Sequence, residues 1–184
     1  MTGTRTLGAA LALTVALVLQ VSVLPHFAWH GVVPNVALLV VVGAALVRGA
    51  QFAMVTGFVA GVLLDLAPPA DHVAGRWALA LLLVGYVAGL VAPEARPTRP
   101  AVLATVAGSS FLGTSVFALS GLVLRDPAVA IPELLQVVAG SVVGDLLVAA
   151  LVLPLVMGLF RRLEPLDIAR RPRLTRPPGR AVAR

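Results

Sequence analysis

The chain has 184 residues, of which 59% are hydrophobic and only 12% are charged. Soluble domains carry about 25% charged residues, so this composition excludes an ordinary soluble globular domain and indicates a membrane protein. The formal net charge is +6 and there is no cysteine, which excludes disulfides, thiol catalysis and thiolate metal sites. Eight of the 14 basic residues, all arginines, follow Phe160. With so hydrophobic a chain, this tail favours anionic lipid headgroups over nucleic acid as its counter-charge.

Six apolar segments follow one another along the chain. They cover residues 7–24, 32–47, 50–66, 77–92, 101–124 and 134–160. They predict an all-α integral membrane protein, a compact bundle of about six short transmembrane helices. A spanning helix needs about 20 apolar residues, so the second and third segments are short, and whether both fully span stays open. An alternative interpretation merges residues 32–66 into one long or re-entrant element.

The placement of the arginines favours six spans with both termini in the cytoplasm. Twelve arginines then lie inside, and two, Arg76 and Arg125, lie outside. This distribution agrees with the positive-inside rule, whereas merging the second and third segments would put one terminus on the wrong side.

Two regions follow from this topology. Residues 1–160 form the transmembrane helical bundle, and residues 161–184 form an arginine- and proline-rich cytoplasmic tail. The tail is too polar to bury a core, so we expect it to be disordered beyond its first turn. Arginines that we expect to set orientation or contact lipid headgroups are Arg161, Arg162, Arg170, Arg171 and Arg173.

Small residues spaced four apart mark several predicted helices. Gly57, Gly61 and Asp65 share one face of the third segment, and Gly85 and Gly89 share a face of the fourth. Because residues without side chains let backbones approach closely, the spacing predicts a compact bundle. A polar cavity for a ligand between the helices is the functional alternative.

Asp65 and Asp145 are the acids within or against apolar segments. An acid at mid-membrane costs about 2.5–3.5 kcal/mol, so each should face protein or water. We expect Asp65 to cap its own helix or to bond to the turn that follows it. We expect Asp145, with Gln136 and Ser141 on nearby faces, to make a buried polar contact. Proton or ion relay by the two acids is the alternative.

His26 and His30 are four residues apart, a spacing at which two histidines can share a metal. Phe27 and Trp29 lie between them, and aromatic residues at this place are typical of an interfacial anchor. We therefore expect no metal site and no cofactor. The sequence also shows no nucleophile–base pair or phosphate loop, so we do not expect an enzyme.

A run of motifs with regular spacing occupies residues 34–89. Pro34-Asn35-Val36-Ala37-Leu38 opens a segment, Arg48-Gly49 follows, and then come Gly57-Phe58-x-x-Gly61-x-x-x-Asp65 and Gly85-Tyr86-Val87-Ala88-Gly89. This succession resembles the rod shape-determining protein MreD family. The resemblance extends over residues 7–160, and the arginine-rich tail departs from it.

The resemblance implies a non-enzymatic, multi-pass component of the bacterial inner membrane. It would act as a scaffold in the cell-elongation (rod) complex and so regulate cell shape and peptidoglycan synthesis. The implied partners are an MreC-like membrane protein and, through it, MreB filaments and the RodA–transpeptidase synthase; anionic lipids follow from the charge, and no nucleic acid is expected. The residues expected to serve partner contact or helix packing are Pro34, Asn35, Gly57, Gly61, Asp65, Gly85 and Gly89.

A small-solute binding component of a membrane transporter is the alternative function. MreD proteins are thought to be distantly similar to the six-helix vitamin-binding components of energy-coupling-factor transporters. Gly8-x-x-x-Ala12-x-x-x-Ala16 in the first segment loosely resembles the alanine-rich helix with which those components dock.

Overall fold

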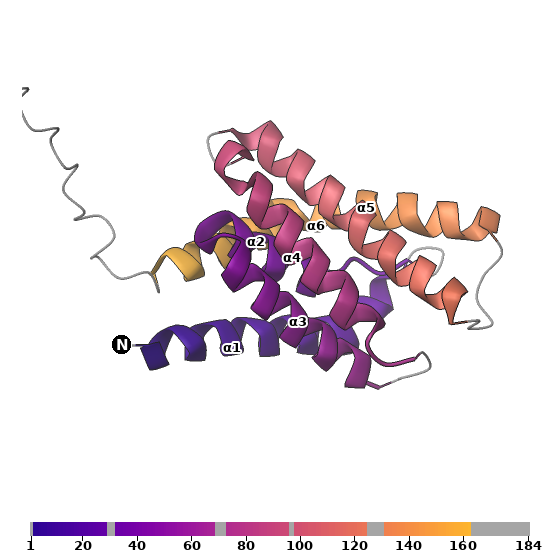
Figure 1. Ribbon diagram of the computed structural model, residues 1–184, viewed down its shortest axis with the longest axis horizontal. Coiled ribbons are helices and arrows are strands. Elements are labelled where there is room, and N and C mark those ends of the chain that lie inside the picture. The colour runs from indigo at the N-terminus through magenta and orange to yellow at the C-terminus, as the bar shows by residue number, and fades with distance from the viewer. Residues whose placement is uncertain (1, 29–31, 69–72, 96–97, 125–130, 163–184) are drawn as a thin grey trace, which may run out of the picture.

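The structure, a computed structural model, describes residues 2–28, 32–68, 73–95, 98–124 and 131–162. The regular elements in these ranges are all helical. They are α1 (Thr2–Val18), the π-helical turn η1 (Leu19–Val23), the 3₁₀ turn η2 (Leu24–Phe27), α2 (Val36–Arg48), α3 (Ala50–Leu66), α4 (Arg76–Ala95), α5 (Arg99–Val123) and α6 (Ile131–Arg162) (Figure 1). The predicted all-α bundle of six helices is confirmed for the described residues.

Helix lengths divide the six into two groups. Three stretches are long and apolar enough to cross a membrane: Arg76–Pro93, Arg99–Val123 and Leu135–Arg162. By contrast, α2 has 13 residues and is about 20 Å long, which is less than the ~30 Å of a hydrocarbon core. The expectation of about six spans is therefore supported for three helices, and α2 is too short to span by itself.

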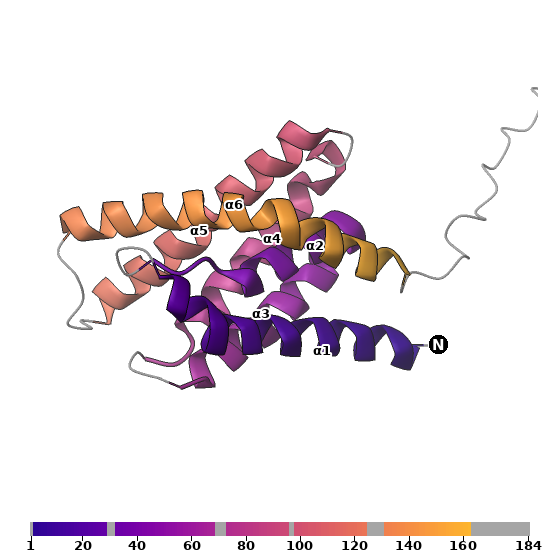
Figure 2. The same cartoon turned by 180° about the vertical axis from the view of Figure 1, so that it is seen from behind.

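The short helix α2 lies at the centre of the bundle. Its residues from Val36 to Leu46 are all buried, and it contacts each of the other five α-helices. Figure 1 shows α4 and α5 on one side of it, and Figure 2, from behind, shows α1 and α6 on the other. A helix that is apolar all round belongs in a protein interior, so α2 is the core on which the other helices pack.

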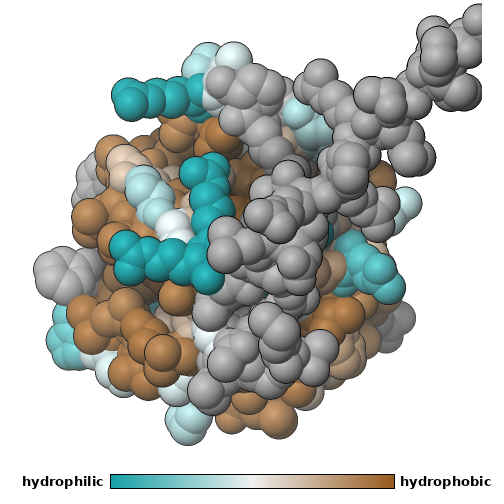
Figure 3. Space-filling model, turned by 90° about the vertical axis from the view of Figure 1, so that its left-hand side faces the viewer, coloured by the Kyte–Doolittle hydropathy of each residue, from teal (hydrophilic) through white to brown (hydrophobic). Residues whose placement is uncertain are grey.

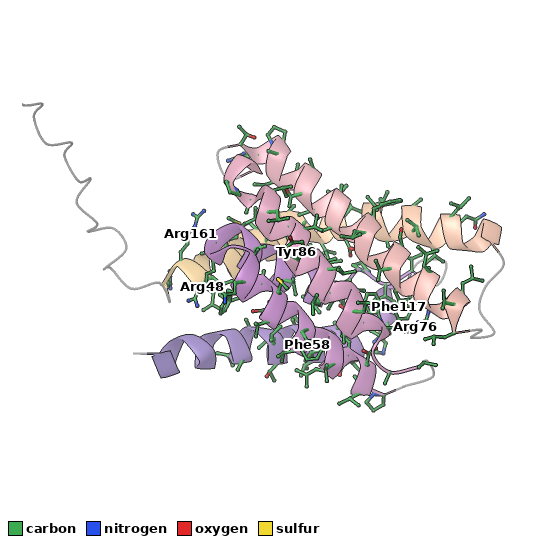
Figure 4. All side chains as sticks on the ribbon, viewed as in Figure 1. Arg48, Phe58, Arg76, Tyr86, Phe117 and Arg161 are labelled. Carbon is green, nitrogen blue, oxygen red and sulfur yellow. The ribbon has the colours of Figure 1, made fainter. Side chains whose placement is uncertain are left out.

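The two ends of the described chain lie on the same side of the molecule. The start of α1 and the end of α6 are both on the left in Figure 1. Arg48 and Arg161 lie there too, whereas Arg76 lies at the opposite end (Figure 4). Since α6 continues to Arg162, Arg161 and Arg162 belong to its last turn; we call this side the arginine end.

Four glycines bring the main chains of α3 and α4 into direct contact. A Cβ added to any of them would overlap atoms of the facing helix: Gly57 faces Leu81, Gly61 faces Trp77 and Ala78, Gly85 faces Ala53, and Gly89 faces Ala50. The two glycine stripes thus face each other inside the chain. This close approach explains why both stripes have the spacing of four residues.

Replacing Gly61 by alanine should destabilise the bundle. The added Cβ would overlap the main chain of α4, and overpacking of this kind costs about 1–3 kcal/mol. The midpoint of thermal unfolding of the purified protein in detergent would fall accordingly. Gly108→Ala in α5 is the matched control, because a Cβ there meets nothing within 4 Å. Equal midpoints for the two variants would contradict the α3–α4 contact.

Candidate functional site: a polar junction inside the bundle

The start of α2 lies inside the protein, where its main-chain N–H groups need partners. The first N–H groups of a helix have no acceptor within the helix, and no water is available in the hydrocarbon region. Asn35 and Val36 are both buried at this point. The structure supplies acceptors from three side chains, and we call Gln20, Asn35, Ser110 and Asp145 the polar junction.

Asn35 and Asp145 satisfy two of these N–H groups. The side chain of Asn35 accepts a hydrogen bond from the Leu38 N–H (2.9 Å), so Asn35 is the N-cap of α2. The Asn35 N–H itself donates to Oδ1 of Asp145 at 2.6 Å. A carboxylate at this position also faces the positive end of the α2 dipole. Asp145 therefore joins α6 to the start of α2.

Gln20, in the π-helical turn η1, also forms hydrogen bonds at the start of α2. Its Oε1 accepts from the Val36 N–H at 2.7 Å, and its Nε2 donates to the Pro34 carbonyl at 3.0 Å. One amide therefore bonds to the main chain on both sides of Asn35. This ties the α1–η1 segment to the beginning of α2.

The second carboxylate oxygen of Asp145 accepts a hydrogen bond from α5. Ser110 on α5 donates its hydroxyl to Oδ2 of Asp145 at 2.6 Å. Both residues are almost completely buried, with exposures of 1% for Asp145 and 0% for Ser110. Hydrogen bonds to an ionised group are about twice as strong as neutral ones, and here they offset the cost of an acid in the interior. Asp145 thus links α2, α5 and α6.

Two glycines of α6 make room for the chain that leads into α2. A Cβ at Gly140 would lie 3.0 Å from Val32 Cγ2, and one at Gly144 would lie 3.3 Å from Pro34 Cγ. The approach of residues 32–34 to α6 places Asn35 beside Asp145. Gly140 and Gly144 therefore help to position the hydrogen bond between Asn35 and Asp145.

Asp65 accepts main-chain N–H groups at the start of α4, as Asp145 does at the start of α2. Its Oδ2 accepts from the N–H groups of Gly75 (2.8 Å) and Ala78 (3.0 Å), and its Oδ1 accepts from that of Trp77 (3.1 Å). We expected a cap on its own helix or the following turn, but Asp65 instead caps the start of α4. A carboxylate is an acceptor, and the end of its own helix offers carbonyls, whereas the next helix start offers N–H donors.

A buried arginine anchors the start of α4 to α5. Arg76 is 6% exposed, and its Nε and Nη2 donate to the Phe117 carbonyl at 3.3 and 2.8 Å. Its guanidinium lies 4.0 Å from the centre of the Phe117 ring, and Trp77 stacks on that ring at 4.4 Å. Figure 4 shows Arg76 and Phe117 together at the end opposite Arg161.

The model of the rod shape-determining protein MreD family matches residues 4–163 of the chain. The chain belongs to the MreD family. The suspected resemblance is thereby confirmed, and with it a role in rod shape determination. The matched range contains the whole polar junction and both acid-capped helix starts of this MreD protein. No curated protein and no solved structure matches the chain.

The other residues expected near Asp145 lie elsewhere on α6 of this MreD protein. Gln136 is exposed and Ser141 is half-buried. Gln136 precedes Asp145 by nine residues, which at 100° per residue puts it on the opposite side of the helix. Gln20 was not identified from the sequence, although an amide in an otherwise apolar segment is a signal that points to it.

Some expected groups fall partly outside the described residues. Nδ1 of His26 lies 3.3 Å from the Val23 carbonyl, but His30 is not among the described residues, nor are Arg170, Arg171 and Arg173. Within the ranges that are described, no group of three or more His, Cys, Asp or Glu side chains is placed to hold a metal.

Replacing Asp145 by leucine should strongly destabilise this MreD protein. The change leaves the Asn35 N–H and the Ser110 hydroxyl without their acceptor, at about 1–3 kcal/mol for each orphaned donor. Thermal unfolding in detergent measures the loss, and Asp145→Asn, which keeps one acceptor oxygen, should lie between Asp145→Leu and wild type. Thr14→Val is the control, because that hydroxyl is exposed and bonds within its own helix. An Asp145→Leu protein as stable as wild type would contradict the junction.

Replacing Asp65 by alanine should loosen the first turn of α4. Three N–H groups lose their acceptor, and losing an N-cap costs about 0.5–2 kcal/mol. Hydrogen exchange followed by mass spectrometry should show faster exchange in a peptide that covers Gly75 to Ala78. Asp65→Asn should show a smaller effect. Unchanged exchange in the alanine variant would show that Asp65 does not hold this turn.

Proposed function

We propose that this MreD protein is a non-enzymatic, multi-pass scaffold of the bacterial inner membrane. It supports the cell-elongation complex by binding partner membrane proteins, first an MreC-like protein and through it MreB filaments and the RodA–transpeptidase synthase. In this way it regulates cell shape and peptidoglycan synthesis. The polar junction is the observation that carries the scaffold role. The side chains of the polar junction form hydrogen bonds that hold the helices together. A bundle fixed in this way can present a constant surface to partner proteins.

The cytoplasmic location of both termini is part of the same proposal. Figure 3 looks onto the arginine end, where hydrophilic side chains stand among hydrophobic ones. Arg161 and Arg162 are exposed there, and Arg48 packs on Phe52 and Phe160, with 4.6 and 5.7 Å between its guanidinium carbon and the ring centres. Arginines beside apolar helices mark the cytoplasmic side of a membrane protein.

The glycine stripes affect partner binding indirectly, through the packing of α3 on α4. Gly57, Gly61, Gly85 and Gly89 lie in the contact between α3 and α4, so a partner helix does not reach them while α3 and α4 stay packed. We infer that they shape the surface of the bundle through the packing of α3 on α4. Their substitution would weaken partner binding by changing the fold.

The alternative of vitamin binding draws no support from the cavity between α1, α2 and α6. Sites for polar small molecules place a few polar groups to orient the ligand. This cavity is lined by aliphatic side chains, which suit a hydrocarbon.

Depletion of the protein in the bacterium that encodes it should turn rods into rounded cells. Side-wall insertion of peptidoglycan should fall at the same time, which labelling with fluorescent D-amino acids measures. Wild-type protein and Thr14→Val should restore the rods, whereas Asp145→Leu should not, because it disrupts the scaffold. Rods of unchanged width and labelling after depletion would overturn the proposed function.

The MreC-like protein of the same bacterium should co-purify with the full chain in mild detergent. Gly108→Leu and Gly158→Leu are the variants for mapping its contact, because a Cβ at either position meets nothing within 4 Å and the fold should tolerate the change. Gly57→Leu should disturb the packing of α3 on α4. Loss of co-purification with this variant is therefore interpreted only together with its size-exclusion profile, which shows whether the protein is folded. A monodisperse wild-type chain that never captures this protein would contradict partner binding.

A further inference from the structure

A groove opens to the membrane between α1, α2 and α6. Its volume is about 270 Å³. Its lining includes Leu11 and Val15 on α1, Leu19 in η1, Val36 on α2, and Leu155 and Leu159 on α6. Leu11, Val15 and Leu155 are 60%, 51% and 67% exposed, so the groove can be entered from the side, from the lipid.

The lining and the volume of the groove suit a linear hydrocarbon. The groove has a volume of about 270 Å³ and is lined by aliphatic side chains, so a flexible chain one methylene wide can enter it between α1 and α6.

The charge at one end of the groove indicates what the hydrocarbon carries. Arg162 follows Leu159 by three residues and Leu155 by seven, so it lies on the face of α6 that lines the groove. Its side chain is exposed in the last turn of α6. Of the acids whose side chains are described, Asp145 is buried in the bundle and Asp65 caps α4, so neither competes for this arginine.

The distance along α6 from the inner end of the groove to Arg162 matches one leaflet. Its α6 lining begins at Val152, and the ten residues from there to Arg162 extend about 15 Å along the helix axis. Half of the hydrocarbon core of a bilayer is also about 15 Å. An acyl chain in the groove would therefore reach from Arg162 to the start of α2, where Val36 donates to Gln20.

We propose that this groove binds one acyl chain of an anionic glycerophospholipid, whose phosphate lies at Arg162. The bound lipid fills the space between α1 and α6 and completes the surface of the bundle in the leaflet at the arginine end. The site adds a specific lipid ligand to the scaffold, and it does not depend on which protein partners the scaffold binds.

Native mass spectrometry of the full-length protein in detergent tests the site. We expect one palmitoyl-oleoyl phosphatidylglycerol to be retained per chain in preference to palmitoyl-oleoyl phosphatidylcholine. Replacing Arg162 by glutamine should weaken retention of phosphatidylglycerol about fivefold, the order expected for removing one arginine from an anionic surface. Arg99→Gln, which changes an exposed arginine on α5, should leave it unchanged.

The groove itself is tested by filling it. Val15→Trp should displace the lipid, whereas Val143→Trp on α6 should not, because Val143 is exposed to a similar extent (54%) but does not line the groove. Unfolding midpoints measured in parallel show whether each variant is folded. Equal retention of the two lipids, or equal effects of the two tryptophans, would overturn the proposal. Lipid retention unaffected by Val15→Trp, together with loss of the MreC-like protein, would overturn it in favour of a helix as the occupant.

Discussion

A helix that begins in the buried interior of a bundle must find acceptors for its first N–H groups, and this requirement organises the protein. The donors are at the start of α2, and the acceptors come from Asp145, Gln20 and the cap residue Asn35. Irregular backbone at membrane depth is tolerated only where protein surrounds it. The segment before α2 meets this condition because α6 provides glycines beside it and a carboxylate at its end.

The two acids of the bundle follow one rule. Each accepts main-chain N–H groups at a helix start, Asp145 for α2 and Asp65 for α4. The charge that is costly in a membrane is therefore placed against the positive end of a helix, where it is stabilised. A proton relay would require these oxygens to exchange partners, but their hydrogen bonds are part of the packing of α2, α4 and α6. The geometry of the two acids therefore supports a structural role for both.

The sequence predicted most of what depends on local pattern. Helices α3 to α6 lie where apolar runs predicted them, because apolar length is a property of the segment itself. The glycine spacing of α3 and α4 predicted close packing, but not that the two stripes face each other. The burial of Asp145 was expected as well, yet its partners Asn35 and Ser110 are 110 and 35 residues away. No periodicity within α6 carries that information.

The wrong expectation for Asp65 and the missing one for Gln20 have related physical causes. Asp65 was expected to cap its own helix or to bond to the turn that follows it, whereas its acceptor oxygens bond to the N–H donors at the start of the next helix. The role of Gln20 depends on the local helix geometry. A π-helical turn changes the angular position of side chains relative to a regular α-helix, so a prediction based on 3.6 residues per turn does not direct this amide at the start of α2.

The same amide connects the junction with the groove. Gln20 makes two hydrogen bonds from the α1–η1 segment to the start of α2, and the residue before it, Leu19, lines the inner end of the groove together with Val36. The position of α1 next to α6 is therefore linked to the hydrogen bonds that fix α2. Apolar helices gain little from contact with each other in lipid, so a gap of this width persists because α1 is held by polar contacts at its end and by small residues such as Ala12 and Ala16 along it. The polar junction thus determines both where α2 begins and how far α1 stands from α6.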